Sequence, residues 1–317
     1  MIVETLTSPI ILFFGLGLLA GFVRSDLAVP EALAKGMALY LMAAIGLKGG
    51  VSVAASGFTA SLGVAATAGM ILSFLLPLPA FALLRSIGGL SRINAAAVAA
   101  HYGSVSLVTF VTAEQMLTGL GLPAAGFMVA VLALMETPAI ISGLYLARRG
   151  QSDTASGSLW HEVLFNASVV LLVGSFVIGL IAGKDGFAPI KPVFDGGYRG
   201  ILCLFLLDMG LIASRRITQT KALTLPLVAL GIAIPLLNGT IGTVAGTMIG
   251  LDVGTAAMLG ILAASASYIA VPAAMRLALP EADPGIYLSM SLGITFPFNI
   301  VFGISLFAWL AQTLGGL

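Results

Sequence analysis

Long apolar runs follow one another along nearly the whole chain, and they constrain its fold more than any other feature. The runs reach about 18 residues or more, which is the length an α-helix needs to cross a bilayer. They leave no soluble domain between them and do not alternate as the strands of a membrane barrel would. Hydrophobic residues make up 59% of the chain and charged residues only 9%, too few charges for a soluble surface. The sequence therefore predicts an all-α polytopic membrane protein.

Hydropathy and turn residues together predict ten transmembrane helices. The expected spans are Pro9–Val23, Ala32–Leu47, Ser61–Leu84, Ile93–Leu117, Ala124–Leu146, His161–Ala182, Tyr198–Ala213, Leu223–Ile249, Thr255–Ala278 and Gly285–Leu314. Loops after odd-numbered spans hold Arg24, Lys35, Arg85, Arg92, Arg148, Arg149, Arg215, Arg216, Lys221 and Arg276, and the opposite side holds Lys48, Lys184, Lys191 and Arg199. Because basic loops stay in the cytoplasm, we expect both termini outside it, in a cell inner membrane.

Short motifs of the first half recur in the second half in the same order. "GLLAG" at 17–21 is echoed by "GLIAG" at 179–183, and "VAAHYGS" at 98–104 by "LAASASY" at 262–268. This spacing predicts two five-span repeats, residues 1–149 and 161–317, joined by a cytoplasmic linker at 150–160. A repeat with an odd number of spans must be inverted relative to its partner, which is an arrangement typical of transporters.

Polar residues gather in the fourth span, "AAHYGSVSLVTF" at 99–110, and in its repeat mate, "AASASYIAVPAAM" at 263–275. Glycine, serine and proline let a helix unwind, and freed backbone is tolerated only where it faces protein or a hydrated cavity. We therefore predict that spans 4 and 9 are discontinuous helices that cross. The half-helices that begin after each break would offer N–H groups to a small anion, and those that end before it would offer carbonyls to a cation. The alternative is that these small residues only pack helices together.

Four stretches resemble the SbtA-type sodium-dependent bicarbonate transporters. They are "VPEALAKGMALYLMAAIGLKGGVSVA" at 29–54, "GSVS" at 103–106, "YRGILCLFLLDMGLIASRRI" at 198–217, and "LAASASYIAVPAAMR" at 262–276 with "PEADPGIY" after it. The resemblance implies ten spans, a core and a gate domain, an elevator-like movement and a homotrimer. It also implies sodium-driven uptake of bicarbonate bound between the two broken helices.

The resemblance also carries the family's binding motifs onto positions of this chain. The family's Ser-Gly-Ser falls on Tyr102, Gly103 and Ser104, and its Ser-Ser-Ser-Asp falls on Ser265, Ala266, Ser267 and Tyr268. Tyr102 changes the size of the expected pocket, and Tyr268 removes a carboxylate that would bind a cation. The expected substrate-binding residues are Tyr102, Gly103, Ser104, Ser265, Ser267 and Tyr268. The family's long cytoplasmic insert is missing, so no soluble regulatory partner is expected.

Polar side chains at membrane depth are candidates for ion coupling, because they are costly there. The candidates are His101, Glu136, Asp208, Thr295 and Asn299. Asp208 could bind sodium or a proton, pair with Lys48 or His101, or pair structurally with Arg215. Thr295 and Asn299 could be ligands of a sodium ion, which could bind at the substrate site itself. Alternatively, these two side chains could join helices by hydrogen bonds. Cys203 is expected to be buried in a span.

Three other functions stay open at this point. The chain could carry a small carboxylate with protons or sodium, or it could be an anion channel. It could also be an intramembrane enzyme in which His101 activates Ser104 or Ser106, although no strand–turn–helix elbow supports that. We find no phosphate-binding loop, metal cluster or nucleic-acid patch in the sequence. We therefore expect a transporter and not an enzyme, with sodium as its coupling ion, no other cofactor and no nucleic-acid partner.

Overall fold

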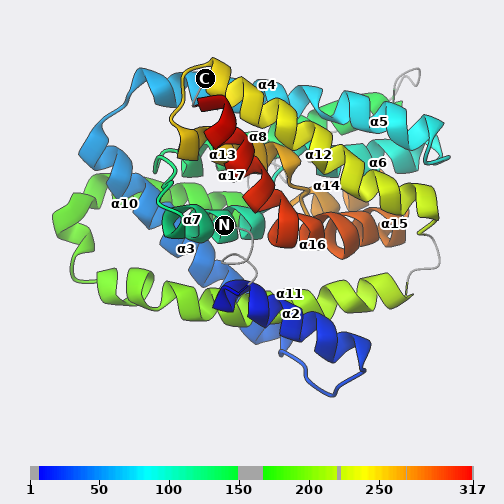
Figure 1. Cartoon of the computed structure of the whole chain (residues 1–317), viewed down its shortest axis with the longest axis horizontal. Helices are drawn as coiled ribbons and strands as arrows, with labels where there is room; N and C mark the ends of the chain where they lie inside the picture. The colour runs from blue at the N-terminus through cyan, green and yellow to red at the C-terminus, as the bar shows by residue number, and fades with distance from the viewer. Residues whose placement is uncertain (1–6, 149–166, 220–222, 269, 316–317) are drawn as a thin grey trace.

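The computed structural model describes residues 7–148, 167–219, 223–268 and 270–315, and every regular element in these ranges is a helix (Figure 1). The first half contains α2 (Pro9–Phe22), α3 (Glu31–Ser56), α4 (Ala60–Leu75), α5 (Pro77–Ser86), α6 (Arg92–Gly103), α7 (Leu107–Gly119) and α8 (Met128–Arg148). The second half contains α10 (Ala167–Phe187), α11 (Tyr198–Gln219), α12 (Leu225–Met248), α13 (Val253–Ala264), α14 (Ala270–Ala278), α15 (Pro284–Leu288), α16 (Phe296–Phe298) and α17 (Ile304–Gly315). The π-helical segments are η1 (Pro192–Gly196), η2 (Ser289–Thr295) and η3 (Asn299–Gly303). The expected linker at 150–160 lies outside the described residues.

The all-α membrane architecture expected from hydropathy is confirmed. Among the described residues, seven helical stretches are long and apolar enough to cross a bilayer. They are Glu31–Ala55, Ala60–Ser86, Arg92–Gly119, Met128–Arg148, Val170–Phe187, Leu225–Met248 and Pro284–Gly315. The helices α2 and α13 are apolar but shorter. The full set of ten spans stays a prediction.

The helix α3 runs well beyond Leu47, where the sequence predicted its end. The glycine pair at 49–50 does not end the helix, which continues to Ser56. Both glycines lie where α3 packs closely against neighbouring helices. A Cβ on Gly49 would lie 2.7 Å from a methyl group of Val129, and one on Gly50 would lie 2.6 Å from the backbone nitrogen of Leu180. As a result, Lys48 lies on a helix and not in a loop.

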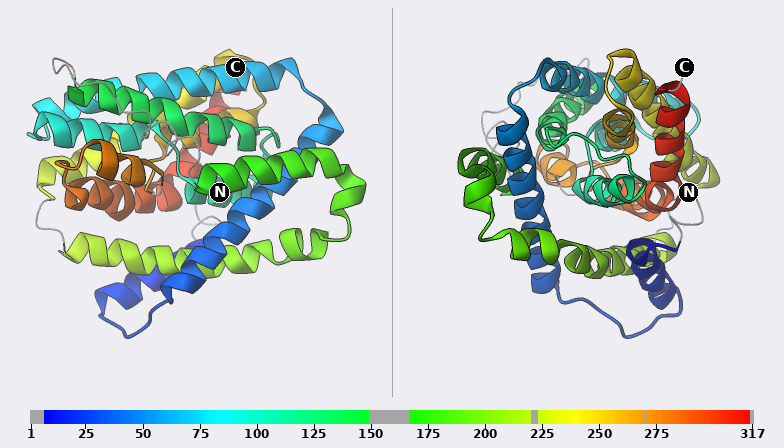
Figure 2. Two further views of the ribbon diagram at one scale, coloured as in Figure 1. Left: turned by 180° about the vertical axis from the view of Figure 1, so that it is seen from behind. Right: turned by 60° about the vertical axis from the view of Figure 1, so that its left-hand side comes forward.

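The helices form two groups. The scaffold group is α2, α3, α10 and α11, in which α2 packs along α11 and α3 packs along α10. Both views in Figure 2 show α2 and α11 side by side at one edge of the molecule. Glycines allow that approach, since a Cβ on Gly210 would lie 2.7 Å from the backbone nitrogen of Leu18. The core group is α4–α8 and α12–α17, and it contains both predicted breaks.

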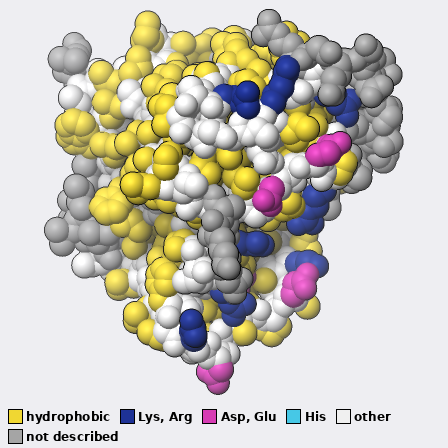
Figure 3. Space-filling view, turned by 90° about the vertical axis from the view of Figure 1, so that its right-hand side faces the viewer, with side chains coloured by type: hydrophobic (Ala, Val, Ile, Leu, Met, Phe, Trp, Pro, Cys, Tyr) yellow, Lys and Arg dark blue, Asp and Glu magenta, His cyan; other side chains and the backbone are white. Residues whose placement is uncertain are grey.

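Figure 3 shows several Lys and Arg side chains on one end of the molecule. Arg92 donates from Nε to the carbonyl oxygen of Leu146 at 2.9 Å, and Arg148 donates to that of Ala278 at 3.2 Å. The side chains therefore close the helix ends as well as carrying charge. Lys48, Lys184 and Lys191 instead line a single cavity. The expected sorting of basic residues between the two sides of the membrane stays a prediction.

Candidate functional site

Both expected interruptions are present in the chain. The helix α6 ends at Gly103 and α7 begins at Leu107, and Ser104 between them is extended, with φ −88° and ψ 173°. The helix α13 ends at Ala264, Ser265 is extended, and α14 begins at Ala270. The first break lies slightly later than predicted, because Tyr102 and Gly103 still belong to the last turn of α6.

The two interruptions touch and satisfy each other's backbone. The backbone N–H of Ser106 donates to Oγ of Ser265 at 2.9 Å, and the N–H of Ser267 donates to the carbonyl oxygen of His101 at 3.0 Å. A hydroxyl cap also starts α7, since Oγ of Ser106 accepts from the N–H of Thr109 at 3.2 Å. Peptide groups freed by the breaks thus find partners inside the protein, as a chain in lipid requires.

A small cavity lies where the breaks meet. It is lined by Val105, Ser106 and Leu107 of the first break, Ser267, Tyr268 and Ala270 of the second, Glu136 of α8, Met42 of α3 and Leu172 of α10. About 10 Å³ of it can hold the centre of a water molecule, so it has room for roughly one water in this conformation. Leu107 and Ala270 are the first residues of α7 and α14, so two helix N-termini reach the cavity. Their N–H groups and dipoles favour an anion.

Glu136 faces the same cavity. Its side chain is buried, and Oε2 has no hydrogen-bond partner among the residues that the structure describes. The backbone carbonyl oxygen of Glu136 accepts from Oγ of Ser104 at 3.4 Å, which links α8 to the first break. A buried carboxylate oxygen without a donor is costly, so this position favours a cation or a proton.

The predicted serines have different positions. Ser267 lines the cavity, and its Oγ accepts from the N–H of Val271 at 3.4 Å. Ser265 uses its hydroxyl within the protein, because Oγ accepts from Ser106 and donates to the carbonyl oxygen of Leu262 at 2.7 Å. Ser104 does not line the cavity. Ser106 lines it instead, a position that the sequence does not single out for substrate binding.

Tyr102 and Gly103 do not line the cavity. Oγ1 of Thr295 donates to the carbonyl oxygen of Gly231 at 2.7 Å, so the hydroxyl of Tyr102, also at 2.7 Å, is the donor to Thr295. This chain of hydrogen bonds joins α6, η2 and α12, and supports the packing role for Thr295. Gly103 lies against α4 and α5, where a Cβ would lie 2.6 Å from the carbonyl oxygen of Ser73. Of the two tyrosines, Tyr268 lines the cavity.

His101 and Asp208 do not line the cavity either. Nδ1 of His101 lies 2.6 Å from the carbonyl oxygen of Ala97, and its ring stacks on Tyr287 with centroids 4.6 Å apart. The imidazole is therefore not paired with Ser104 or Ser106 as an enzyme would require. Asp208 lies on α11 in the scaffold group. Lys48 is not its partner, since Lys48 pairs with other carboxylates.

Two asparagines cap the carbonyl ends of the broken helices. Nδ2 of Asn299 donates to the carbonyl oxygen of Ala264 at 2.8 Å, and Nδ2 of Asn238 donates to that of Tyr102 at 3.0 Å. Each leaves a buried Oδ1 that has no partner among the described residues. Sequence reasoning missed Asn238. Its signal was a single amide in an otherwise apolar span, which is costly unless it has a partner.

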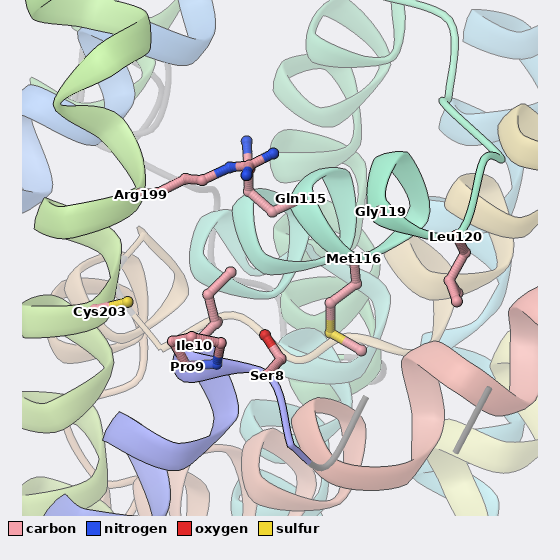
Figure 4. Close-up of a pocket in the computed structure, with 9 residues that line it drawn as sticks. All are labelled: Ser8, Pro9, Ile10, Gln115, Met116, Gly119, Leu120, Arg199 and Cys203. Atoms are coloured by element: carbon pink, nitrogen blue, oxygen red, sulfur yellow. The ribbon is translucent and has the colours of Figure 1, made fainter. Parts of the chain in front are cut away.

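A larger cavity, of about 630 Å³, lies between the two groups (Figure 4). It is lined by Ser8, Pro9, Ile10, Gln115, Met116, Gly119, Leu120, Arg199 and Cys203. Cys203 is half-buried here and not fully buried as expected, because α11 faces this cavity. Figure 4 shows Arg199 reaching from α11 toward Gln115 on α7.

The profile of the Na⁺-dependent bicarbonate transporter superfamily matches residues 9–312, which is nearly the whole chain. A comparison with curated proteins returned no match.

Proposed function

Because this chain belongs to the Na⁺-dependent bicarbonate transporter superfamily, we propose that it imports bicarbonate with sodium through the cavity between its two broken helices. The superfamily consists of transporters and not of enzymes, and the apolar helices agree with a membrane protein. The observation that carries the proposal is the meeting of Glu136 with the N-termini of α7 and α14 in one cavity.

This meeting gives a physical reason for coupling. The N-termini of α7 and α14, with the hydroxyls of Ser106 and Ser267, attract an anion. An ionised Glu136 in the same cavity repels it. Two like charges about 4 Å apart repel by about 4 kcal/mol near a protein surface, which would weaken anion binding by roughly a thousandfold. A sodium ion at Glu136 removes this repulsion, so each ion binds well only when the other is present.

Asn299 is our second candidate sodium ligand. Its Oδ1 is a buried neutral oxygen beside the end of α13, and unwound helix ends are places where transporters bind sodium. Thr295 is not part of the proposed sodium site, because its hydroxyl already joins Tyr102 to Gly231.

The proposal also includes the expected architecture. Ten spans form two inverted five-span repeats, and the core group moves relative to the scaffold group so that the cavity opens to each side in turn. The protein is a homotrimer in the inner membrane with both termini outside the cytoplasm. The support is the resemblance, the sorting of basic residues and the division of the helices into two groups.

The test is uptake of labelled bicarbonate into liposomes that contain the purified protein, with and without an inward sodium gradient. The wild type should show saturable uptake that needs sodium. Glu136→Gln should take up bicarbonate at a rate that no longer depends on sodium. Glu31→Gln is the control, because Glu31 is exposed and pairs with Lys35, one turn along α3.

Other results would identify the other functions. Uptake of a small carboxylate but not of bicarbonate would show that the carboxylate is the substrate. A flux that does not saturate would indicate a channel. Unchanged sodium dependence in Glu136→Gln would remove Glu136 from the coupling mechanism.

A further inference from the structure

A third cavity, of about 650 Å³, lies between the last turns of α3 and the segment that follows Gly183. It is lined by Lys48, Val51, Ser52, Ala55, Lys184, Phe187, Ala188, Lys191 and Asp195. Three of these side chains are cations and one is an anion. The cavity is separate from the crossing of the broken helices and shares no residue with it.

A turn at Gly183 builds this cavity. Gly183 has φ 61° and ψ −163°, a backbone conformation that favours glycine, and it interrupts the helical path of α10. The chain after the turn brings Lys184 and Lys191 to the last turns of α3. Tyr40 of α3 then holds this segment, because its hydroxyl donates to the carbonyl oxygen of Val193 and its ring stacks on Phe194.

The three lysines differ in how their charge is used. Nζ of Lys48 lies 3.3 Å from Asp195, 3.6 Å from Glu114 and 4.9 Å from the ring centre of Tyr198. Its charge is therefore balanced inside the protein. Within the described ranges, neither Lys184 nor Lys191 has a carboxylate within ion-pair distance. Two unbalanced cations on one concave surface raise the local concentration of anions.

We propose that Lys184 and Lys191 form a second anion site, which binds a small oxyanion before it reaches the crossing of the broken helices. The role in recruitment rests on the proposed transport function, while the binding itself does not. An ammonium group binds the oxygens of bicarbonate or of a phosphate equally well as a point charge. The bound oxyanion comes from solution or is the headgroup of an anionic lipid.

The site lies beside the contact between the two helix groups. Lys48 lines the cavity and also pairs with Glu114 of α7, in the core group. An anion bound at Lys184 and Lys191 competes with Asp195 and Glu114 for Lys48. Occupation of the second site therefore weakens one of the contacts that hold α7 to α3.

The binding test measures how fast an amine-reactive reagent modifies each lysine, by mass spectrometry, in protein held in zwitterionic lipid. Only the neutral amine reacts, and a bound anion stabilises the ammonium form. Inorganic phosphate should slow modification of Lys184 and Lys191 about threefold or more, and Lys35 should be unaffected. Lys35 is the internal control, because it lies on α3 and pairs with Glu31.

A second arm uses vesicles of phosphatidylglycerol without dissolved phosphate. Protection by these vesicles but not by phosphate would identify a lipid headgroup as the ligand, and protection by phosphate would identify a dissolved oxyanion. If neither slows the modification of Lys184 and Lys191 relative to Lys35, the proposal is wrong. None of these outcomes depends on transport, so they are independent of whether bicarbonate is the substrate.

The recruitment role has its own readout. The double variant Lys184→Gln and Lys191→Gln should need a higher bicarbonate concentration for half-maximal uptake, by about fivefold for each lysine replaced. Its maximal rate should be unchanged. Lys184→Arg with Lys191→Arg should retain the wild-type value, because the charges remain. Equal half-maximal concentrations in the Gln and Arg variants would exclude recruitment.

Discussion

Arg199 of α11 donates a hydrogen bond from Nε to Oε1 of Gln115 on α7, across 2.7 Å. The preceding residue, Glu114, lies 3.6 Å from Nζ of Lys48 on α3. Two adjacent residues of the core group are therefore tied to two helices of the scaffold group. Any sliding of one group past the other must break both contacts.

Loss of the hydrogen bond between Arg199 and Gln115 should make it easier for the core group to move away from the scaffold group. We expect Gln115→Ala to speed thiol modification of Cys203, the single cysteine, because this residue lines the cavity between the groups. A hydrogen bond to a charged group contributes about 1.5–3 kcal/mol, so the rate should rise at least about tenfold. Arg24→Gln, an exposed cation at the far end of α2, is the control. An unchanged rate in Gln115→Ala would show that this contact does not limit opening.

Ser267 and Ser104 should differ in their effect on the substrate. Ser267 lines the cavity, whereas Ser104 bonds to the backbone of Glu136. Ser267→Ala should raise the bicarbonate concentration for half-maximal uptake by about tenfold, since one hydrogen bond contributes about 1 kcal/mol or slightly more. Ser104→Ala should change it less than twofold. Equal effects of the two substitutions would contradict the geometry of the cavity.

Substitution of Gly103 should lower the stability of the fold. A Cβ there would lie 2.6 Å from the carbonyl oxygen of Ser73, so Gly103→Ala should lower the free energy of unfolding by about 1–3 kcal/mol. Gly200→Ala on α11 is the matched control, because in the part of the chain that the structure describes no atom beyond its own stretch of helix would lie within 4 Å of its Cβ. Thermal unfolding in detergent measures both. A melting temperature in Gly103→Ala equal to that of Gly200→Ala would show that α6 can shift away from Ser73.

Tyr102 should contribute to the core and not to substrate binding. Tyr102→Phe removes the donor to Thr295 and should cost about 1 kcal/mol of stability. Uptake should keep its half-maximal bicarbonate concentration. A changed value, with folding intact, would place Tyr102 in the substrate site after all.

Substitutions at Asn299 and Asn238 distinguish a role in sodium binding from a role in helix capping. Both amides cap a broken helix, but we assign only Asn299 to sodium. Asn299→Ala should raise the sodium concentration for half-maximal uptake about tenfold, and Asn238→Ala should not. A shift in the second variant alone would move the sodium site to the first break.

The breaks were predictable because their causes are local. Serines at 104 and 106 and the proline at 272 weaken a helix wherever it lies. The directions of the side chains were not predictable. Ser106 meets Ser265, and Tyr102 meets Thr295, in contacts between residues that lie far apart in the sequence. Periodicity within one span contains no information on which neighbour will occupy each face.

Asn238 shows the same limit in a different form. The sequence displays it as one amide in an apolar helix, without a motif around it. Its role follows from the carbonyl of Tyr102, which α6 leaves unpaired only because the helix ends there. A residue whose role is to cap a carbonyl on another helix, as Asn238 does, lies in no sequence motif that would reveal that role.

The mutual hydrogen bonds between the two interruptions have a consequence for biogenesis. Neither half of the chain can complete its own interrupted helix, because Ser265 serves the first break and the carbonyl of His101 serves the second. The N-terminal half emerges first from the ribosome. The N–H of Ser106 therefore lacks its partner, Ser265, until the second half has been inserted. Complementation between separately expressed halves would therefore require that both be inserted together.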